Sequence, residues 1–272
     1  MYVQWILIKR IFAGHSPLRF TALMTAINIL MAIGVFYYMT VVVGTSSGSR
    51  AQIYRFYGGV AAFMSVGVSM NALLTVGLNA VAKAINDERN QGTLSYWIMC
   101  QPRLLKLVLQ ASLGEFLLAG VNALVTFALL VALFGVHFHV NLLSFAVVAA
   151  VSLLAVVGVG LVAASLNITG NTGQNPILWA WGLTTNFMAG VFVPIEVFDN
   201  PFIHTVSSAV PVTHALLAMR SAVLRDAPLN DPILDAHLLY WGLFAVLMLP
   251  LGAWLFRRGL DRALMRGNLV QS

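Results

Sequence analysis

Long apolar runs separated by short polar segments dominate the chain. A transmembrane helix needs about 20 apolar residues, because the hydrocarbon core is about 30 Å thick and a helix rises about 1.5 Å per residue. Six runs meet or approach this length: residues 20–43, 56–81, 107–135, 142–166, 177–193 and 238–256. The pattern predicts an all-α integral membrane protein with six transmembrane helices, of which the fifth is marginal in length.

Composition excludes the main alternative, a soluble globular protein. Of 272 residues, 60% are hydrophobic and 9% are charged, against about 45–50% and about 25% in soluble domains. Six spans and their loops use the whole length, so residues 1–272 are expected to form one transmembrane domain. The single cysteine, Cys100, allows no disulfide within the chain.

Basic residues predict the orientation in the membrane, since cytoplasmic loops carry an excess of Lys and Arg. With the N-terminus inside, eleven lie on the inner side and four on the outer side: Lys9, Arg10, Arg19, Lys83, Arg89, Arg103, Lys106, Arg257, Arg258, Arg262 and Arg266 against Arg50, Arg55, Arg220 and Arg225. Both termini are therefore expected in the cytoplasm. The net charge of +6 reflects this topology, and no nucleic-acid partner is expected.

The first 19 residues have the composition of a helix that lies along the inner membrane surface. Val3, Trp5 and Ile6 stand close to Lys9 and Arg10, which is typical of an interfacial amphipathic segment. The order, apolar and then basic, is the reverse of a signal peptide, so no cleaved leader is expected.

Uncharged polar residues form stripes on the first two predicted helices. Because a helix turns 100° per residue, these polar residues fall on one face of each helix. They are Thr21, Thr25 and Asn28 on the first helix, and Ser65, Ser69, Asn71, Thr75 and Asn79 on the second. Two interpretations remain open, hydrogen bonding between helices or subunits and a translocation path lined by neutral groups. Glu115 is the single acidic residue within a span, and it is expected to face other helices or the inner surface near Arg103 or Lys106.

The segment 82–106, between the second and third spans, is more than a connector. It begins with the densest cluster of charge in the chain, including Asp87, Glu88 and Arg89, and continues through Gly92 and Thr93. Leu94, Trp97 and Ile98 then recur at helical spacing, which predicts a cytoplasmic helix that docks a soluble partner.

Residues 190–220, after the fifth span, predict two short helices. Asp199-Asn200-Pro201 is typical of a helix start, with a capping side chain and a proline in the first turn. Pro211 then interrupts the segment. Mixed apolar and acidic residues favour a hairpin that dips into the outer leaflet, and a loop flat on the surface is the alternative.

Two of these segments resemble the ABC-2 type transporter permeases. The first is Asn86-Asp-Glu88-Arg89-Asn-Gln-Gly92-Thr93-Leu94. The second is Gly190-Val-Phe-Val-Pro194-Ile-Glu, followed by Val210-Pro211 and ending at Arg220. The resemblance implies six spans, a coupling segment that receives movement from an ATPase, and a re-entrant hairpin. It also implies export of a drug, lipid, peptide or glycan across a bacterial inner membrane, and pairing with a second copy or a related permease.

ATP binding is expected in a separate subunit. The three lysines, Lys9, Lys83 and Lys106, are not followed by Ser or Thr, so the chain has no Walker A loop. We therefore expect no enzymatic activity and no cofactor in this chain, with ATP and Mg bound by a partner ATPase. No metal site is expected, because the histidines are not accompanied by Cys or acidic ligands. The alternative functions are a secondary transporter or channel, and a membrane assembly factor.

Overall fold

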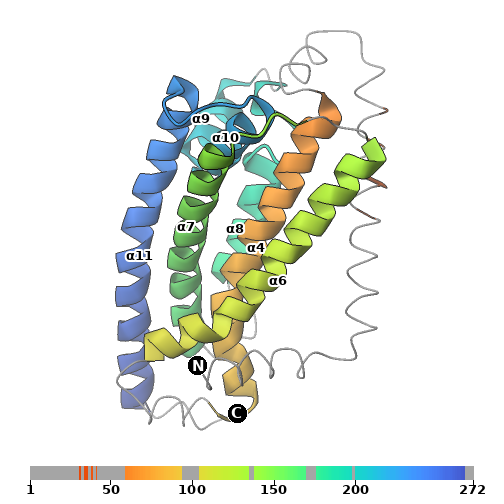
Figure 1. Ribbon diagram of the computed structural model, residues 1–272. Coiled ribbons are helices and arrows are strands. Elements are labelled where there is room, and N and C mark those ends of the chain that lie inside the picture. The colour runs from red at the N-terminus through yellow and green to blue at the C-terminus, as the bar shows by residue number, and fades with distance from the viewer. Residues whose placement is uncertain are drawn as a thin grey trace.

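The computed structural model describes residues 59–93, 104–134, 138–169, 176–197 and 200–266, with the single residues 31, 34, 35, 38 and 41. Every regular element in these ranges is helical (Figure 1): α4 (Val60–Asn90), α6 (Leu104–Phe134), α7 (Leu142–Thr169), α8 (Pro176–Met188), the 3-10 turn η1 (Ile195–Val197), α9 (Pro201–Ala209), α10 (Pro211–Leu224) and α11 (Pro232–Arg266). The all-α prediction is confirmed for this part of the chain.

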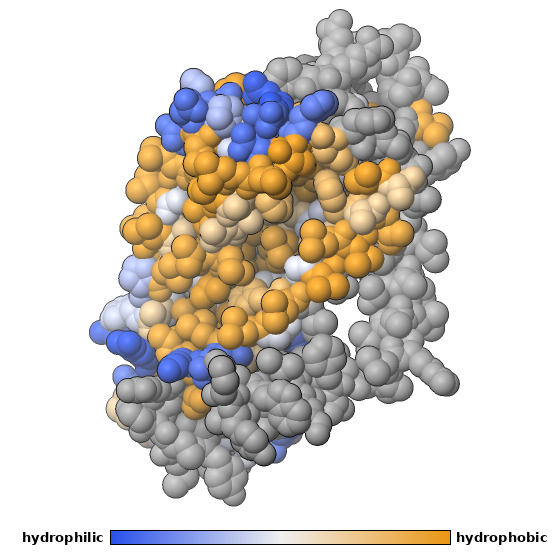
Figure 2. Space-filling view, viewed as in Figure 1, coloured by the Kyte–Doolittle hydropathy of each residue, from blue (hydrophilic) through white to orange (hydrophobic). Residues whose placement is uncertain are grey.

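An apolar belt surrounds the helices. Figure 2 shows it as a broad band between two hydrophilic ends, and exposed Leu, Val and Trp side chains of α6, α7 and α11 contribute to it. Among the described residues, three helices are long and apolar enough to cross a bilayer, Val60–Glu88, Leu142–Ile168 and Pro232–Ala263, and the bent pair α9 and α10 could form a fourth crossing. The protein is therefore membrane-embedded, and the number of six spans stays a prediction.

Helix α7 lies between α4 and α11 and packs most closely against α11 (Figure 1). A Cβ atom on Gly252 of α11 would lie 2.3 Å from the carbonyl oxygen of Gly158 on α7. Small residues allow helix backbones to approach in this way, which is a common means of association in membranes. Nearer the start of α11 in the same interface, the buried Trp241 donates a hydrogen bond from Nε1 to Ser152 Oγ at 2.9 Å.

Helix ends differ from the predicted spans where the chain turns polar. Helix α4 continues past residue 81 to Asn90, and α11 continues past residue 256 to Arg266, because charged residues leave the apolar layer without ending a helix. The fifth predicted span, 177–193, is too long: α8 has 13 residues and ends at Met188. Gly190 follows in the left-handed region with φ +71°, which terminates the helix.

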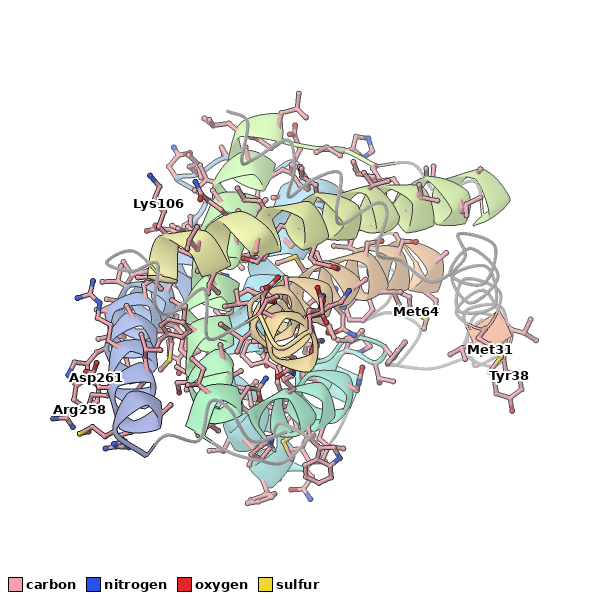
Figure 3. All side chains as sticks on the ribbon, turned by 90° about the horizontal axis from the view of Figure 1, so that it is seen from below. Met31, Tyr38, Met64, Lys106, Arg258 and Asp261 are labelled. Atoms are coloured by element: carbon pink, nitrogen blue, oxygen red, sulfur yellow. The ribbon has the colours of Figure 1, made fainter. Side chains whose placement is uncertain are left out.

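Part of the first predicted span is also described. Residues 31, 34, 35, 38 and 41 are helical and share one exposed face, with the apolar side chains Met31, Val35, Tyr38 and Val41. Met31 and Tyr38 lie at the edge of the described helices, on the side away from α11 (Figure 3). The predicted interfacial helix over 1–19 and the stripe of Thr21, Thr25 and Asn28 lie outside the described residues.

Candidate functional site

Hydrogen-bonding side chains follow one side of α4 at intervals of four residues. Asn71 Nδ2 donates to Oδ1 of Asn186 on α8 at 3.2 Å, and Thr75 Oγ1 donates to Asn71 Oδ1 at 3.4 Å. One turn further, Asn79 Nδ2 donates to the Thr75 carbonyl oxygen at 2.8 Å. We call Asn186, Asn71, Thr75 and Asn79 the polar ladder.

The polar ladder is not enclosed by the described helices. Asn71, Thr75 and Asn79 are half-buried and Asn186 is exposed. Amide and hydroxyl groups are costly in contact with hydrocarbon. The ladder is therefore suited to contact with a further helix, a second subunit or water.

Ser69 does not join the polar ladder. Its side chain is 9% exposed and lines an apolar cavity of about 190 Å³ between α4, α6, α7 and α10. The Ser69 hydroxyl makes no hydrogen bond within the described residues. Ser65 is also buried, and its hydroxyl donates to the Ala61 carbonyl oxygen at 2.7 Å. The predicted stripe on this helix thus divides into an open row and two buried serines.

An ion pair lies one turn below the ladder. Lys83 Nζ of α4 lies 2.6 Å from Glu115 Oε1 of α6, with the two side chains 44% and 17% exposed. Glu115 does face another helix, as expected, and its partner there is Lys83. Lys106 points away from the bundle at its rim (Figure 3), and Arg103 lies outside the described residues. The two charges of the pair neutralise each other at the inner end of the polar row.

The C-terminal end of α4 has the geometry of a Schellman motif. The Thr93 N–H donates to the Glu88 carbonyl oxygen at 2.9 Å, with Gly92 between them at φ +69°. This is the backbone geometry in which glycine at the C′ position ends a helix. The chain is thereby turned sharply at the centre of the predicted coupling segment.

The structure shows the surroundings of three residues of that segment, and their role in coupling stays a prediction. Glu88 is 6% exposed and its carboxylate accepts a hydrogen bond from Thr93 Oγ1, so it stabilises the helix end and does not present a free charge to a partner. A Cβ atom on Gly92 would meet nothing within 4 Å, so the role of this glycine is conformational and is not close packing. Asp87 is exposed. The side chains of Arg89, Leu94 and Trp97 lie outside the described part of the chain.

The two short helices predicted after the fifth span are present. Asn200 caps α9 by accepting a hydrogen bond from the Phe202 N–H at 2.9 Å, and Pro201 occupies the first turn. Pro211 begins α10, and the two helices meet at 86°. Proline needs no N–H partner in a first turn, so it allows a new helix to begin at the bend. We call α9, α10 and the preceding turn of residues 189–197 the hairpin.

Arg220 joins the hairpin to α4. Its side chain is 2% exposed, and one guanidinium nitrogen donates to the carbonyl oxygens of Gly190 at 2.9 Å and Val191 at 3.1 Å. On α4, the guanidinium carbon lies 3.4 Å from the centre of the Phe63 ring. Arg220, which is predicted from the sequence to lie among the charges on the outer side, is thus a buried residue that connects two parts of the fold. We call this arrangement the Arg220 latch.

Gly67 makes room for the latch. A Cβ on this residue would lie 2.4 Å from the Val191 carbonyl oxygen and 2.6 Å from the Arg220 guanidinium. The turn itself depends on Gly190, whose positive φ few other residues adopt, and on Pro194, which is buried beside it. The hairpin residues Gly190, Pro194, Pro211 and Arg220 thus act in turn formation and in attachment to α4.

Histidine does not build a metal site in the described part of the chain. No group of three or more His, Cys, Asp or Glu side chains converges there. His214 and His237 do meet, with their Nδ1 atoms 2.9 Å apart, and link the start of α10 to α11. His137 lies outside the described ranges.

Comparison with known families identifies the family of the chain. A family model described as ABC-2 family transporter protein matches residues 45–254, which is most of the chain. The chain belongs to the ABC-2 transporter family. No curated protein matches it. The permease is accordingly the membrane component of an ABC transporter, and the family implies association with an ABC ATPase, which is a different protein.

Several residues of the permease that matter in the structure carried little signal in the sequence. Phe63 and Gly67 sit in an apolar run where glycine is common, and Arg220 lies 157 positions after Phe63 in the chain. Asn186 could have been noticed, because Thr184, Thr185 and Asn186 form a polar interruption in the fifth run. The pairing of Lys83 with Glu115 required knowledge of how α4 and α6 pack.

Proposed function

We propose that this ABC-2 permease exports its substrate along the polar ladder, driven by ATP that a separate ATPase subunit binds with Mg and hydrolyses. The observation that carries the proposal is the layout of α4. This one helix of 31 residues, about 46 Å long, bears the Arg220 latch near its outer end, the ladder in its middle and the coupling segment at its inner end.

A continuous helix can transmit movement between these points. The ATPase docks at the segment 82–106, where Asp87 is exposed and the Schellman motif ends α4. Displacement of this end tilts α4 and changes the exposure of Asn71, Thr75 and Asn79. The latch carries the same movement to the hairpin, so the outer end opens or closes with the inner end.

The proposed assembly contains two permeases and two ATPase subunits. Because the ladder is half-buried, we place it opposite the first span, with Thr21, Thr25 and Asn28, or opposite a second permease, which is a copy or a related chain. The path then runs between hydrogen-bonding groups. The remaining features follow the sequence: six spans surrounded by membrane lipid, both termini in the cytoplasm, a hairpin that dips into the outer leaflet, and a bacterial inner membrane.

The test begins with the permease purified from its native membrane under mild conditions. We expect an ATPase subunit to co-purify and the reconstituted complex to hydrolyse ATP. Glu88→Ala removes the Thr93 contact and Gly92→Trp forces a bulky residue into a positive φ, so both should uncouple hydrolysis from transport without unfolding the bundle.

Gly182→Trp is the matched control for the glycine substitution, because Gly182 of α8 also has open space around its Cβ position but no positive φ. Transport and hydrolysis unchanged in both coupling variants would remove this segment as the coupling element. Transport by the permease without any ATPase would support the secondary transporter or channel instead.

A further inference from the structure

A cavity of about 490 Å³ lies between α8 and the hairpin, at the Asn186 end of the polar ladder. Its walls come from the end of α8, the turn of residues 190–195 and α9. Most of the side chains that line it are apolar: Met188, Phe192, Val193, Phe202, Ile203 and Val206. We call it the outer chamber. Its volume falls in the range of about 300–1,000 Å³ that is typical of small-molecule sites.

The outer chamber and the polar ladder share one residue. Asn186 lines the chamber, and its Oδ1 accepts the hydrogen bond from Asn71 at 3.2 Å. A bound molecule that fills the chamber therefore meets the amide of Asn186 at one end, with Asn71 bonded to it, and walls that are apolar apart from Ser207. The same side of α4 continues with Thr75 and Asn79, so further hydrogen-bonding groups extend toward the cytoplasm.

Charge is missing from this surface in the described part of the chain. No residue that lines the chamber is titratable, and the ladder consists of amides and one hydroxyl. Lys83 and Glu115 neutralise each other at the inner end, and Glu196, the nearest described carboxylate along the chain, is exposed. A charged group is strongly disfavoured in such surroundings because nothing compensates for its lost hydration.

We infer that the outer chamber binds the apolar part of an uncharged amphiphile, whose hydroxyl or amide groups bond to Asn186 and Asn71. The inference rests on the proposed function and names the substrate class of that path. An alkyl glycoside is the simplest molecule of this kind. Amphiphiles with the same alkyl chain but an anionic or cationic head group serve as the comparison. They differ from the alkyl glycoside in carrying a charge, which the site is expected to reject.

The experiment uses the permease with its ATPase subunit in lipid nanodiscs. The probe is a decyl maltoside with a photoreactive diazirine at the end of its alkyl chain, and labelled peptides are identified by mass spectrometry. We expect labelling within residues 186–207. Unlabelled decyl maltoside should displace the probe at concentrations roughly tenfold lower than decyl sulfate or decyltrimethylammonium, as expected for one or two discriminating polar contacts.

Variants test the apolar wall of the chamber and the amide of Asn186 separately. Val206→Trp fills the chamber and should reduce labelling several-fold, whereas Val206→Ala enlarges it and should preserve labelling, which separates blocking from misfolding. Asn186→Leu should leave the alkyl chain bound but abolish the preference for the neutral head. The control is Leu243→Trp, because Leu243 lies on the exposed face of α11.

Equal competition by the charged amphiphiles, labelling outside residues 186–207, or full labelling of Val206→Trp would each overturn the inference. Photolabelling does not need ATP hydrolysis. A complex that shows the expected labelling but neither hydrolyses ATP nor transports would contradict the proposed function and would support the binding site.

Discussion

Replacement of Arg220 by Met tests the connection between the hairpin and α4. Met keeps much of the length and apolar character of the arginine stem but has no donor for the carbonyl oxygens of Gly190 and Val191. Hydrogen bonds from a charged donor contribute about 1.5–3 kcal/mol each, and the stacking on Phe63 adds about 1–2 kcal/mol. Removal of the buried charge recovers several kcal/mol of desolvation cost. The expected net loss of folding free energy is about 2–4 kcal/mol.

Two assays measure the Arg220→Met effect. A loss of this size should lower Tm by roughly 5–15 °C, on the scale of about 2–4 °C per kcal/mol for chains of this size. In a Cys100→Ser background, Val193→Cys should react faster with N-ethylmaleimide when Arg220 is replaced, because the turn is no longer held against α4. Arg225→Met is the control, since it removes the same charge from the half-buried end of α10.

The reasoning is refuted if Arg220→Met leaves both Tm and the reactivity at position 193 unchanged. A fall in Tm that Arg225→Met reproduces would show that the net charge matters and the latch geometry does not. Arg220→Lys should recover little stability, because an ammonium group lacks the planar face that stacks on Phe63 and the reach of the guanidinium fork.

Two further substitutions examine how the long helices are held together. Gly252→Leu should separate α11 from α7 and lower the free energy of unfolding by about 3 kcal/mol or more. The effect should be seen as a lower Tm or as loss of the monodisperse protein. Gly182→Leu, at a glycine with open surroundings, should have little effect. Lys83→Met should lower Tm by leaving the Glu115 carboxylate without its lysine, and Lys83→Met with Glu115→Leu should recover most of the loss; a double variant as unstable as the single one would contradict this account.

The sequence was sufficient for features that depend on local pattern. Apolar runs predicted α4, α6, α7 and α11, and the Asn200-Pro201 and Pro211 signals predicted the hairpin helices, because capping and proline geometry act within a few residues. Helix ends were less predictable. Charge after residue 81 marks the edge of the apolar layer, whereas α4 continues to Asn90 and ends where Gly92 adopts a positive φ.

Features that depend on long-range packing were not predictable. Arg220 was predicted to lie in the hairpin and on the outer side, but its contact with α4 was not, because nothing near it in the sequence shows that α4 offers a glycine at the point of contact. Ser69 and Asn71 read as one stripe, because helical periodicity gives direction but not the neighbouring helix. Asn71 then pairs with α8, while Ser69 faces an apolar cavity.

The central claim is that the polar side of α4 lines the translocation path. It is tested most directly by Thr75→Cys in the Cys100→Ser background, labelled with a membrane-impermeant thiol reagent in the complex with its ATPase subunit. The account predicts that the labelling rate of Thr75→Cys changes when ATP and vanadate trap the complex. Leu243→Cys, on the exposed face of α11, should stay unreactive with and without trapped nucleotide. A Thr75→Cys that is equally unreactive with and without trapped nucleotide would contradict the claim.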